Sequence, residues 1–138
     1  MHWSQVGARL LVRDFHAVFD FYREKIGLEI NWGNRDGDYV AFSAPGATSP
    51  CLAIFKRERM PRYQGYVHPE STAASDHVIL IIPTDDVDKD YAELRAHGVV
   101  FMGEPQTIPE WYMRCVYFRD PEGNLLELCQ AGEYAEED

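Results

Sequence analysis

Glu127 is the side chain in this sequence that most directly suggests chemistry, because it is a carboxylate inside the apolar run at residues 125–128. Burying an unpaired charge is costly, so Glu127 should face water, pair with a cation or bind a metal ion. Residues 120–124 predict a β-hairpin, since Asp120 can open a turn, Pro121 presets φ and Gly123 tolerates a positive φ. Glu127 is therefore expected on the second strand of that hairpin.

Hydrophobic patterns predict two similar halves. In the first half, Asp14 caps a helix that ends at Gly27, and strands are expected at 6–12, 28–32, 39–42 and 51–55. In the second half, Thr84 or Asp85 caps a helix that ends at Gly98, and strands are expected at 76–82, 99–102, 114–118 and 125–128. The offset of roughly 70 residues indicates an internal duplication. It aligns Val40-Ala-Phe42 with Val116-Tyr-Phe118 and residues 52–55 with 125–128.

This pattern predicts one α+β domain built from two tandem βαβββ modules. Module one covers residues 4–56, a connector covers 57–75, module two covers 76–130, and an acidic tail covers 131–138. The sequence of the connector predicts no regular secondary structure, and its length makes it a candidate lid or dimer-crossing segment.

The formal net charge of −10 argues against nucleic acid or an anionic membrane as a partner, because both need a basic surface. It suits a cationic ligand, or it simply keeps the protein soluble. The start of the chain does not resemble a signal peptide, and three cysteines without a CxxC pair suggest reduced thiols, so we expect a cytoplasmic protein. Cys115 and Cys129 are placed to face each other across the hairpin.

The stretch Asp-Pro-Glu-Gly-Asn-Leu-Leu-Glu-Leu at 120–128 resembles the closing motif of the vicinal oxygen chelate superfamily, the group of glyoxalase I, bleomycin-resistance proteins and extradiol dioxygenases. The order of the preceding motifs is also similar: Arg9-Leu-Leu-Val-Arg-Asp14, an aromatic helix ending at Gly27-Leu28, and Asp76-His77-Val78. The resemblance extends from residue 6 to residue 128. It implies two cup-shaped mixed sheets that enclose a pocket for a small molecule, commonly in a homodimer.

The resemblance also implies where a metal ion would bind. Family metalloenzymes take one ligand from the first strand and one from the last strand of each module. Module two then offers His77 and Glu127, whereas module one has Gly7 and Ile54, which cannot bind a metal through their side chains. Catalytic sites normally offer three protein ligands, and the dioxygenase triad also lacks one histidine here.

A divalent ion such as Ni, Zn, Mn or Fe would therefore need further ligands, for example His68 or Glu70 from the connector. The alternative is that His77 is a structural hydrogen-bonding residue, or that it pairs directly with Glu127.

Arg9 follows Gly7 by two residues, so the period of a strand puts both side-chain positions on one face. If that face lines the cup, the guanidinium would replace the charge of the metal and pair with Glu127. The alternative is an exposed arginine at a sheet edge.

Trp111 and Arg114 could form part of a ligand site, because Trp111 with the adjacent Tyr and Met makes an apolar wall and Arg114 adds a cation. Bleomycin-resistance proteins have a comparable Pro-Trp stretch, in which aromatic stacking and an acidic surface hold a planar cationic drug. The alternative is that Trp111 covers the core. Tyr39 is a weaker candidate for ligand contact, as is Trp32, because aromatic side chains on strands usually pack.

Two functions remain open from the sequence. The first is a protein that binds a small organic ligand, for example a cationic aromatic one, without a complete metal site. The second is a divalent-metal-dependent lyase, isomerase or dioxygenase acting on a vicinal oxygen substrate, with Glu127 as metal ligand or proton-transfer base. A third hypothesis is a degenerate domain that only dimerises with a partner.

Overall fold

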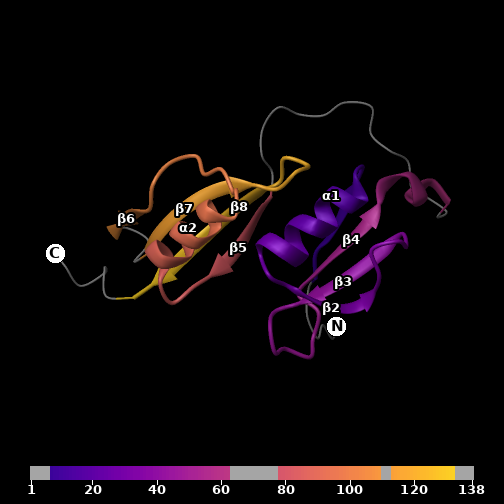
Figure 1. Ribbon diagram of the computed structural model, residues 1–138, viewed down its shortest axis with the longest axis horizontal. Coiled ribbons are helices and arrows are strands. Elements are labelled where there is room, and N and C mark those ends of the chain that lie inside the picture. Colours follow the sequence, from indigo (N-terminus) through magenta and orange to yellow (C-terminus); the bar gives the residue numbers. More distant parts are fainter. Residues whose placement is uncertain (1–6, 63–77, 110–112, 133–138) are drawn as a thin grey trace, which may run out of the picture. The chain divides into compact units, whose positions relative to one another are not determined.

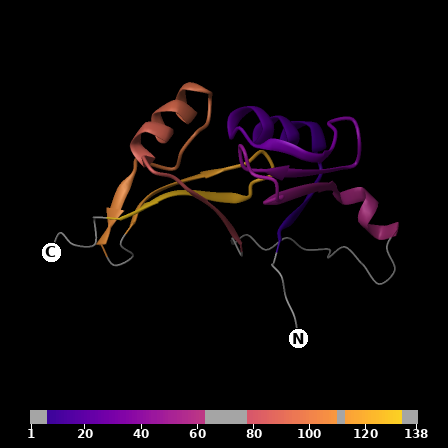
Figure 2. The same ribbon diagram turned by 90° about the horizontal axis from the view of Figure 1, so that it is seen from below.

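The computed structural model describes residues 7–62, 78–109 and 113–132, which fall in two compact units, Met1–Thr72 and Ala73–Asp138 (Figure 1). Each unit contains one four-stranded sheet, and each sheet carries one α-helix on one of its faces (Figure 2). This architecture is the predicted α+β fold of two βαβββ modules. None of the described helices is long and apolar enough to cross a membrane.

In the first unit the strands are arranged in the order β1-β4-β3-β2. β1 pairs with β4 in parallel, and the other pairs are antiparallel. The elements are β1 (Arg9–Val12), α1 (Phe15–Asp20), the π-helical turn η1 (Phe21–Lys25), β2 (Glu29–Gly33), β3 (Tyr39–Ser43), β4 (Leu52–Lys56) and the 3-10 helix η2 (Arg57–Arg62).

α1 begins where the sequence predicts, because the Asp14 carboxylate accepts a hydrogen bond from the Ala17 N–H at 3.1 Å. The buried face of the helix packs on the sheet through aromatic rings. Phe19 and Tyr22 lie 5.7 and 6.3 Å from the ring of Phe42, measured between centroids. The face of the sheet that carries Phe42 therefore forms the core of this unit, and its opposite face is left for other uses.

The second unit repeats this plan in the order β5-β8-β7-β6, with β5 and β8 parallel. The elements are β5 (Ile79–Pro83), α2 (Val87–Ala96), β6 (Gln106–Ile108), β7 (Met113–Arg119) and β8 (Leu125–Ala131). Tyr91 of α2 contacts the ring of Phe101, which in turn contacts Phe118 of β7, at 4.8 and 5.0 Å between centroids. The α2 side of this sheet is thus the counterpart of the α1 side in the first unit.

Several local predictions for the second half were wrong. The cap of α2 is Asp86, which accepts from the Lys89 N–H, whereas the Thr84 hydroxyl accepts from the Asp86 N–H and so only supports the cap. Residues 99–102 form no strand and contribute one isolated bridge, from Phe101 to Phe118. In their place β6 pairs with β7, in a segment where the sequence pattern predicts no strand. In the connector, residues 57–62 form η2 instead of irregular chain, and residues 63–75 lie outside the described part.

The closing hairpin has the predicted turn, and the residue that opens it, Asp120, makes most of its hydrogen bonds. This side chain is only 5% exposed. One carboxylate oxygen accepts from the backbone N–H groups of Glu122 and Asn124, and the other accepts from the Asn124 side chain, all at 2.9 Å. Gly123 adopts φ +87°, a conformation that favours glycine. The turn therefore holds β7 and β8 in register.

Replacing Asp120 with Ala is expected to lower the free energy of unfolding by about 2 kcal/mol, because three donors in a buried turn lose their acceptor. Urea denaturation followed by circular dichroism measures this change. The matched control is Asp36→Ala, at an exposed turn position in the first unit, which should shift the free energy by less than about 0.5 kcal/mol. Equal losses in both variants would contradict the role given to Asp120.

Candidate functional site

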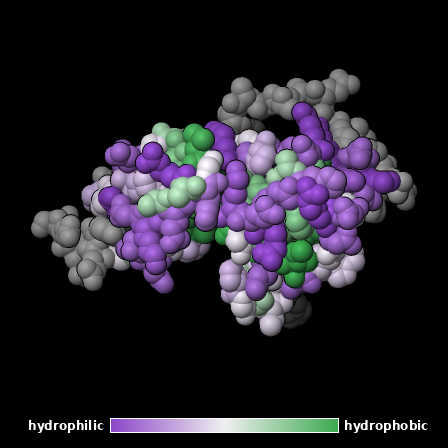
Figure 3. Space-filling model, viewed as in Figure 1, coloured by the Kyte–Doolittle hydropathy of each residue, from purple (hydrophilic) through white to green (hydrophobic). Residues whose placement is uncertain are grey.

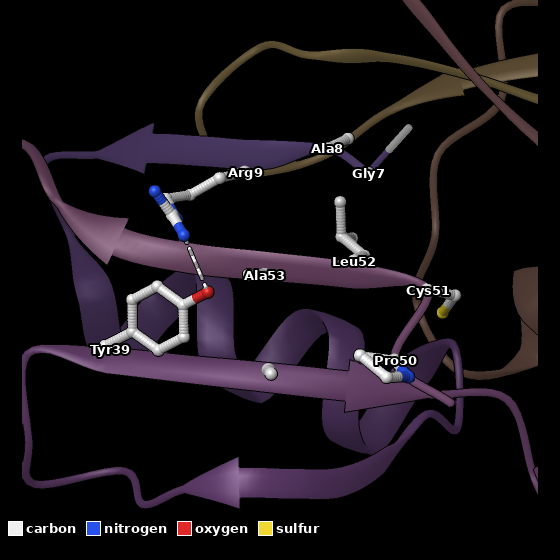
Figure 4. Close-up of a pocket in the computed structure, with 9 residues that line it drawn as sticks. Gly7, Ala8, Arg9, Tyr39, Pro50, Cys51, Leu52 and Ala53 are labelled. Carbon is white, nitrogen blue, oxygen red and sulfur yellow. Dashed lines mark hydrogen bonds between the residues drawn. The ribbon is translucent and has the colours of Figure 1, made fainter. Parts of the chain in front are cut away.

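The first unit has an open cavity of about 370 Å³ on the sheet face opposite α1, which we call the Arg9 cavity (Figure 4). Its position follows from strand register. Ala41 pairs with Ala53, so their side chains point away from the face that carries Phe42. The cavity is lined by Gly7, Ala8, Arg9, Tyr39, Ala41, Pro50, Cys51, Leu52 and Ala53.

Arg9 is held against Tyr39 in two ways. Its Nη2 and Nε donate to the Tyr39 hydroxyl oxygen at 3.2 and 3.4 Å, and the guanidinium carbon lies 5.0 Å from the centroid of the ring (Figure 4). The Arg9 side chain makes no salt bridge with any carboxylate in the described part of the chain. Gly7 and Arg9 both line the cavity, as does Ala8 between them, so the prediction that Gly7 and Arg9 share one face of the strand stays a prediction.

Tyr39 also belongs to a row of aromatic rings across the sheet. The rings of Trp32 and Phe55 lie 5.7 and 5.8 Å from it, between centroids. Trp32 pairs with Ala41, so it lies on the same face as the cavity, and it is 64% exposed. Sequence reasoning gave Trp32 little weight because aromatic side chains on strands usually pack. The small Ala41 beside it was the available signal, since a small partner leaves the indole uncovered.

Small residues create the space in the cavity. Ala41 and Ala53 form part of its floor, and Gly7 lies at its rim in Figure 4. A Cβ atom built on Gly7 would meet no heavy atom within 4 Å. The position could therefore hold a larger side chain, and its present occupant keeps the space open.

In the second unit, Glu127 is buried, with an exposed fraction of 4%. It lies on the sheet face opposite α2, where the Tyr117 hydroxyl donates to its Oε1 at 2.8 Å. Burial, followed by a hydrogen bond to Glu127, raises the pKa of the Cys115 thiol to about 12. The same two causes raise the pKa of Tyr117, and burial raises that of Cys129. Among the described residues the carboxylate is thus satisfied by neutral donors, an option not considered from the sequence.

The sequence alignment of the two modules, which makes Ile54 the counterpart of Glu127, was wrong. Ile54 pairs with Val40 on the α1 side of its sheet, whereas Glu127 pairs with Tyr117 on the face away from α2. Neighbouring residues of a strand point to opposite faces, so a shift of one residue changes the environment completely. The correct counterpart must come from the adjacent position on β4.

The capping aspartates identify that counterpart. Asp14 and Asp86 both cap the helix that follows the first strand of their module, and aligning them places Arg9 at the position of Ile81. Arg9 pairs with Ala53, and Ile81 pairs with Glu127. Ala53 therefore occupies in module one the position that Glu127 occupies in module two.

The described residues do not by themselves fit a metal ion. No group of three His, Cys, Asp or Glu side chains comes together within residues 7–62, 78–109 and 113–132. Ile81, the neighbour of Glu127 on β5, offers no donor atom. His77, His68 and Glu70 lie outside these ranges, so their proposed part in a metal site stays a prediction.

The remaining candidate residues are placed as follows. Arg114 lies on the α2 side of its sheet, where it forms an ion pair with Asp88 at 2.8 Å and donates to Thr107; this contact lowers the pKa of Asp88. Arg114 and Glu127 therefore point to opposite faces. Trp111 lies outside the described residues. Arg9 and Glu127 belong to different units, and their pairing stays a prediction, as do the ligand-binding roles of Arg114 and Trp111.

Comparison with known proteins agrees with this architecture. A family model described as the Glyoxalase/Bleomycin resistance protein/Dioxygenase superfamily matches residues 4–128. The chain belongs to this superfamily. It is 34% identical over 121 residues to the uncharacterized protein YraH of Bacillus subtilis (strain 168), covering 87% of this chain and 92% of that protein.

Two solved structures of the superfamily fold illustrate the likeness. A glyoxalase/bleomycin resistance protein/dioxygenase from Nocardioides matches with a TM-score of 0.77 and 23% identity, over 96% of this chain and 87% of the other. TnmS3, an antibiotic binding protein from Streptomyces sp. CB03234, matches with a TM-score of 0.69 and 28% identity, over 96% and 99% of the two chains.

Replacing Tyr117 with Phe should lower the free energy of unfolding by about 1–3 kcal/mol, because Glu127 then keeps its burial and loses a neutral donor. Thermal and urea unfolding measure the change. Tyr91→Phe is the matched control, since the Tyr91 hydroxyl accepts only a long hydrogen bond of 3.4 Å from the exposed Arg95. A Tyr117→Phe protein as stable as the control would contradict the proposed hydrogen bond.

The three thiols should differ in reactivity. Cys51 is exposed at the Arg9 cavity, whereas Cys115 and Cys129 are 2% and 7% exposed. We expect a thiol reagent such as DTNB to modify one cysteine in the native protein and the other two only on unfolding, because buried protonated thiols are poor nucleophiles. Cys51→Ser should remove the native reaction. Fast modification of two thiols in the native protein would show that the Cys115 environment is open.

Proposed function

We propose that this member of the superfamily binds a small organic molecule in the Arg9 cavity and holds it without chemical change. The observation that carries the proposal is the combination, in one cavity, of a guanidinium held on an aromatic ring and a floor of alanines. A volume of about 370 Å³ is in the range of small-molecule sites. The likeness to an antibiotic binding protein supports the same reading.

The lining residues favour binding over catalysis. The guanidinium of Arg9 offers hydrogen-bond donors and no acceptor, so it is not suited to act as a general base. Among the described residues that line the cavity, Cys51 alone carries a thiol, and partial desolvation raises its pKa above that of an ordinary thiol, although it stays accessible to reagents. Within the described part of the chain, the lining contains no carboxylate or imidazole that could move a proton. These side chains are suited to hold and orient a ligand.

The charge of the cavity differs from that of the whole protein. The visible surface is mostly hydrophilic (Figure 3) and the chain carries a net −10, which led to the expectation of a cationic aromatic ligand. Arg9 is, however, the one charged side chain among the described residues that line this cavity. The local charge therefore favours neutral or anionic ligands, and a cationic ligand remains an outcome that the ligand screen can detect.

A screen of aromatic compounds that includes acids, amides and amines tests this function. We expect at least one class to raise the melting temperature and to slow the modification of Cys51, which lines the cavity. Gly7→Phe should abolish both effects, because position 7 has free space around its Cβ and the new ring would fill the cavity. Ala92→Phe, on the exposed surface of α2, is the control and should bind normally.

Metal content tests the alternative of a metal-dependent lyase, isomerase or dioxygenase. The protein is incubated with nickel, zinc, manganese or iron, desalted and analysed for elements. A near-stoichiometric ion that is lost in both His77→Ala and Glu127→Gln would overturn binding without chemistry, and assays for lyase and dioxygenase activity would follow. The homodimer implied by the family resemblance also remains a proposal, which light scattering can measure.

A further inference from the structure

We propose that the Arg9 cavity selects planar aromatic acids, with the carboxylate on the Arg9 guanidinium and the ring beside Tyr39 and Trp32. This inference rests on the proposed function and specifies the class of ligand. Three observations carry it: the open donors of Arg9, the aromatic row next to it, and the absence of a competing carboxylate among the residues that line the cavity.

The guanidinium has donors left for a ligand. Arginine carries five N–H groups in a planar fork that matches a carboxylate. Nε and Nη2 both point at the Tyr39 hydroxyl oxygen, and Nη1 has no hydrogen-bond partner in the described part of the chain. Nη1 and the second N–H of Nη2 can therefore donate two parallel hydrogen bonds to the two oxygens of a carboxylate. Contact with the Tyr39 ring fixes the plane of the Arg9 guanidinium before a ligand arrives, which reduces the conformational entropy lost on binding.

The aromatic part of the ligand has a surface to lie on. The rings of Tyr39 and Trp32 are neighbours on the same sheet face, and the indole of Trp32 is 64% exposed. An exposed tryptophan next to a cavity gains apolar contact when a flat ligand covers it. The alanines at positions 41 and 53 leave room for a ring close to the sheet.

Nearby acids do not cancel the charge of Arg9. Asp38 precedes Tyr39 in the chain, but its carboxylate pairs with Lys56 at 3.4 Å and with Arg59 at 3.1 Å. The remaining negative charge of the protein acts over longer distances, where salt screens it within about 8–10 Å. A carboxylate in contact with Arg9 is therefore attracted, whereas an ammonium group in the same place is repelled and loses its hydration.

Three probes of the same shape test the inference: 2-naphthoate, 2-naphthamide and 2-naphthylmethylammonium. Binding is measured by titration calorimetry and by Trp fluorescence at two salt concentrations. We expect 2-naphthoate to bind at least tenfold more tightly than the amide, the ammonium compound to bind most weakly, and salt to reduce only the preference for the acid. Protection of Cys51 from modification reports whether the probe occupies the Arg9 cavity.

Variants then separate charge from shape. Arg9→Met keeps an apolar chain of similar length and should remove the preference for the acid, while Arg9→Lys should keep part of it because a point charge cannot form the fork. Arg35→Met is the control, because Arg35 pairs with Asp20 at 2.7 Å on the surface and does not line the cavity. Melting temperatures confirm that each variant is folded.

The outcomes distinguish this inference from the proposed function. If all three probes bind equally and Arg9→Met changes nothing, the cavity binds aromatic compounds without regard to charge; the inference is then overturned and the proposed function stands. If none of the probes binds, or the ammonium compound binds best, the inference is also overturned, and the wider screen decides the function. If Gly7→Phe leaves 2-naphthoate binding intact, the ligand lies elsewhere and both proposals fail.

Discussion

The candidate site depends on the parallel pairing of β1 with β4. This pairing places Arg9 beside Ala53, and the antiparallel pairing of β4 with β3 places Ala41 on the other side. Because side chains alternate between the two faces of a strand, a shift of one residue would move Ala53 to the α1 side and bring Ile54 into the cavity. The register is held by the core itself, since Val40, Phe42 and Ile54 are completely buried on the α1 side.

The two modules share one strand arrangement but carry different side chains at equivalent positions. Module one has Arg9 and two alanines, which leave an open cavity with a cation at one side. At the matching positions module two has Ile81, Tyr117 and Glu127, where the Tyr117 hydroxyl donates to the buried carboxylate and Ile81 is 55% exposed. The two copies can differ in this way because the face of each sheet that packs on its helix is separate from the face that carries these residues.

Glu127 illustrates how neutral groups can satisfy a buried acid. Removing a carboxylate from water is costly, and a cation or metal is the usual compensation. Here a phenol donates to it at 2.8 Å and a thiol hydrogen-bonds to it as well. Burial first, and then the hydrogen bond to Glu127, raise the pKa values of both Tyr117 and Cys115, so both groups become weaker acids. The Tyr117 hydroxyl is therefore a neutral hydrogen-bond donor to the buried carboxylate.

The sequence by itself determined the features that depend on neighbours in the chain. These are the number of modules, the cap at Asp14, the turn at Asp120 and Gly123, and the presence of an unusual carboxylate at Glu127, all of which follow from periodicity and short-range hydrogen bonds. Only the tertiary structure decided which side chains meet. Strand register showed that Ala53, and not Ile54, is the counterpart of Glu127, and it placed Arg114 on the α2 side. The exposure of Trp32 and the partner of Arg9 also depend on strands far apart in sequence, because pairing between distant segments is set by the packing of the whole core.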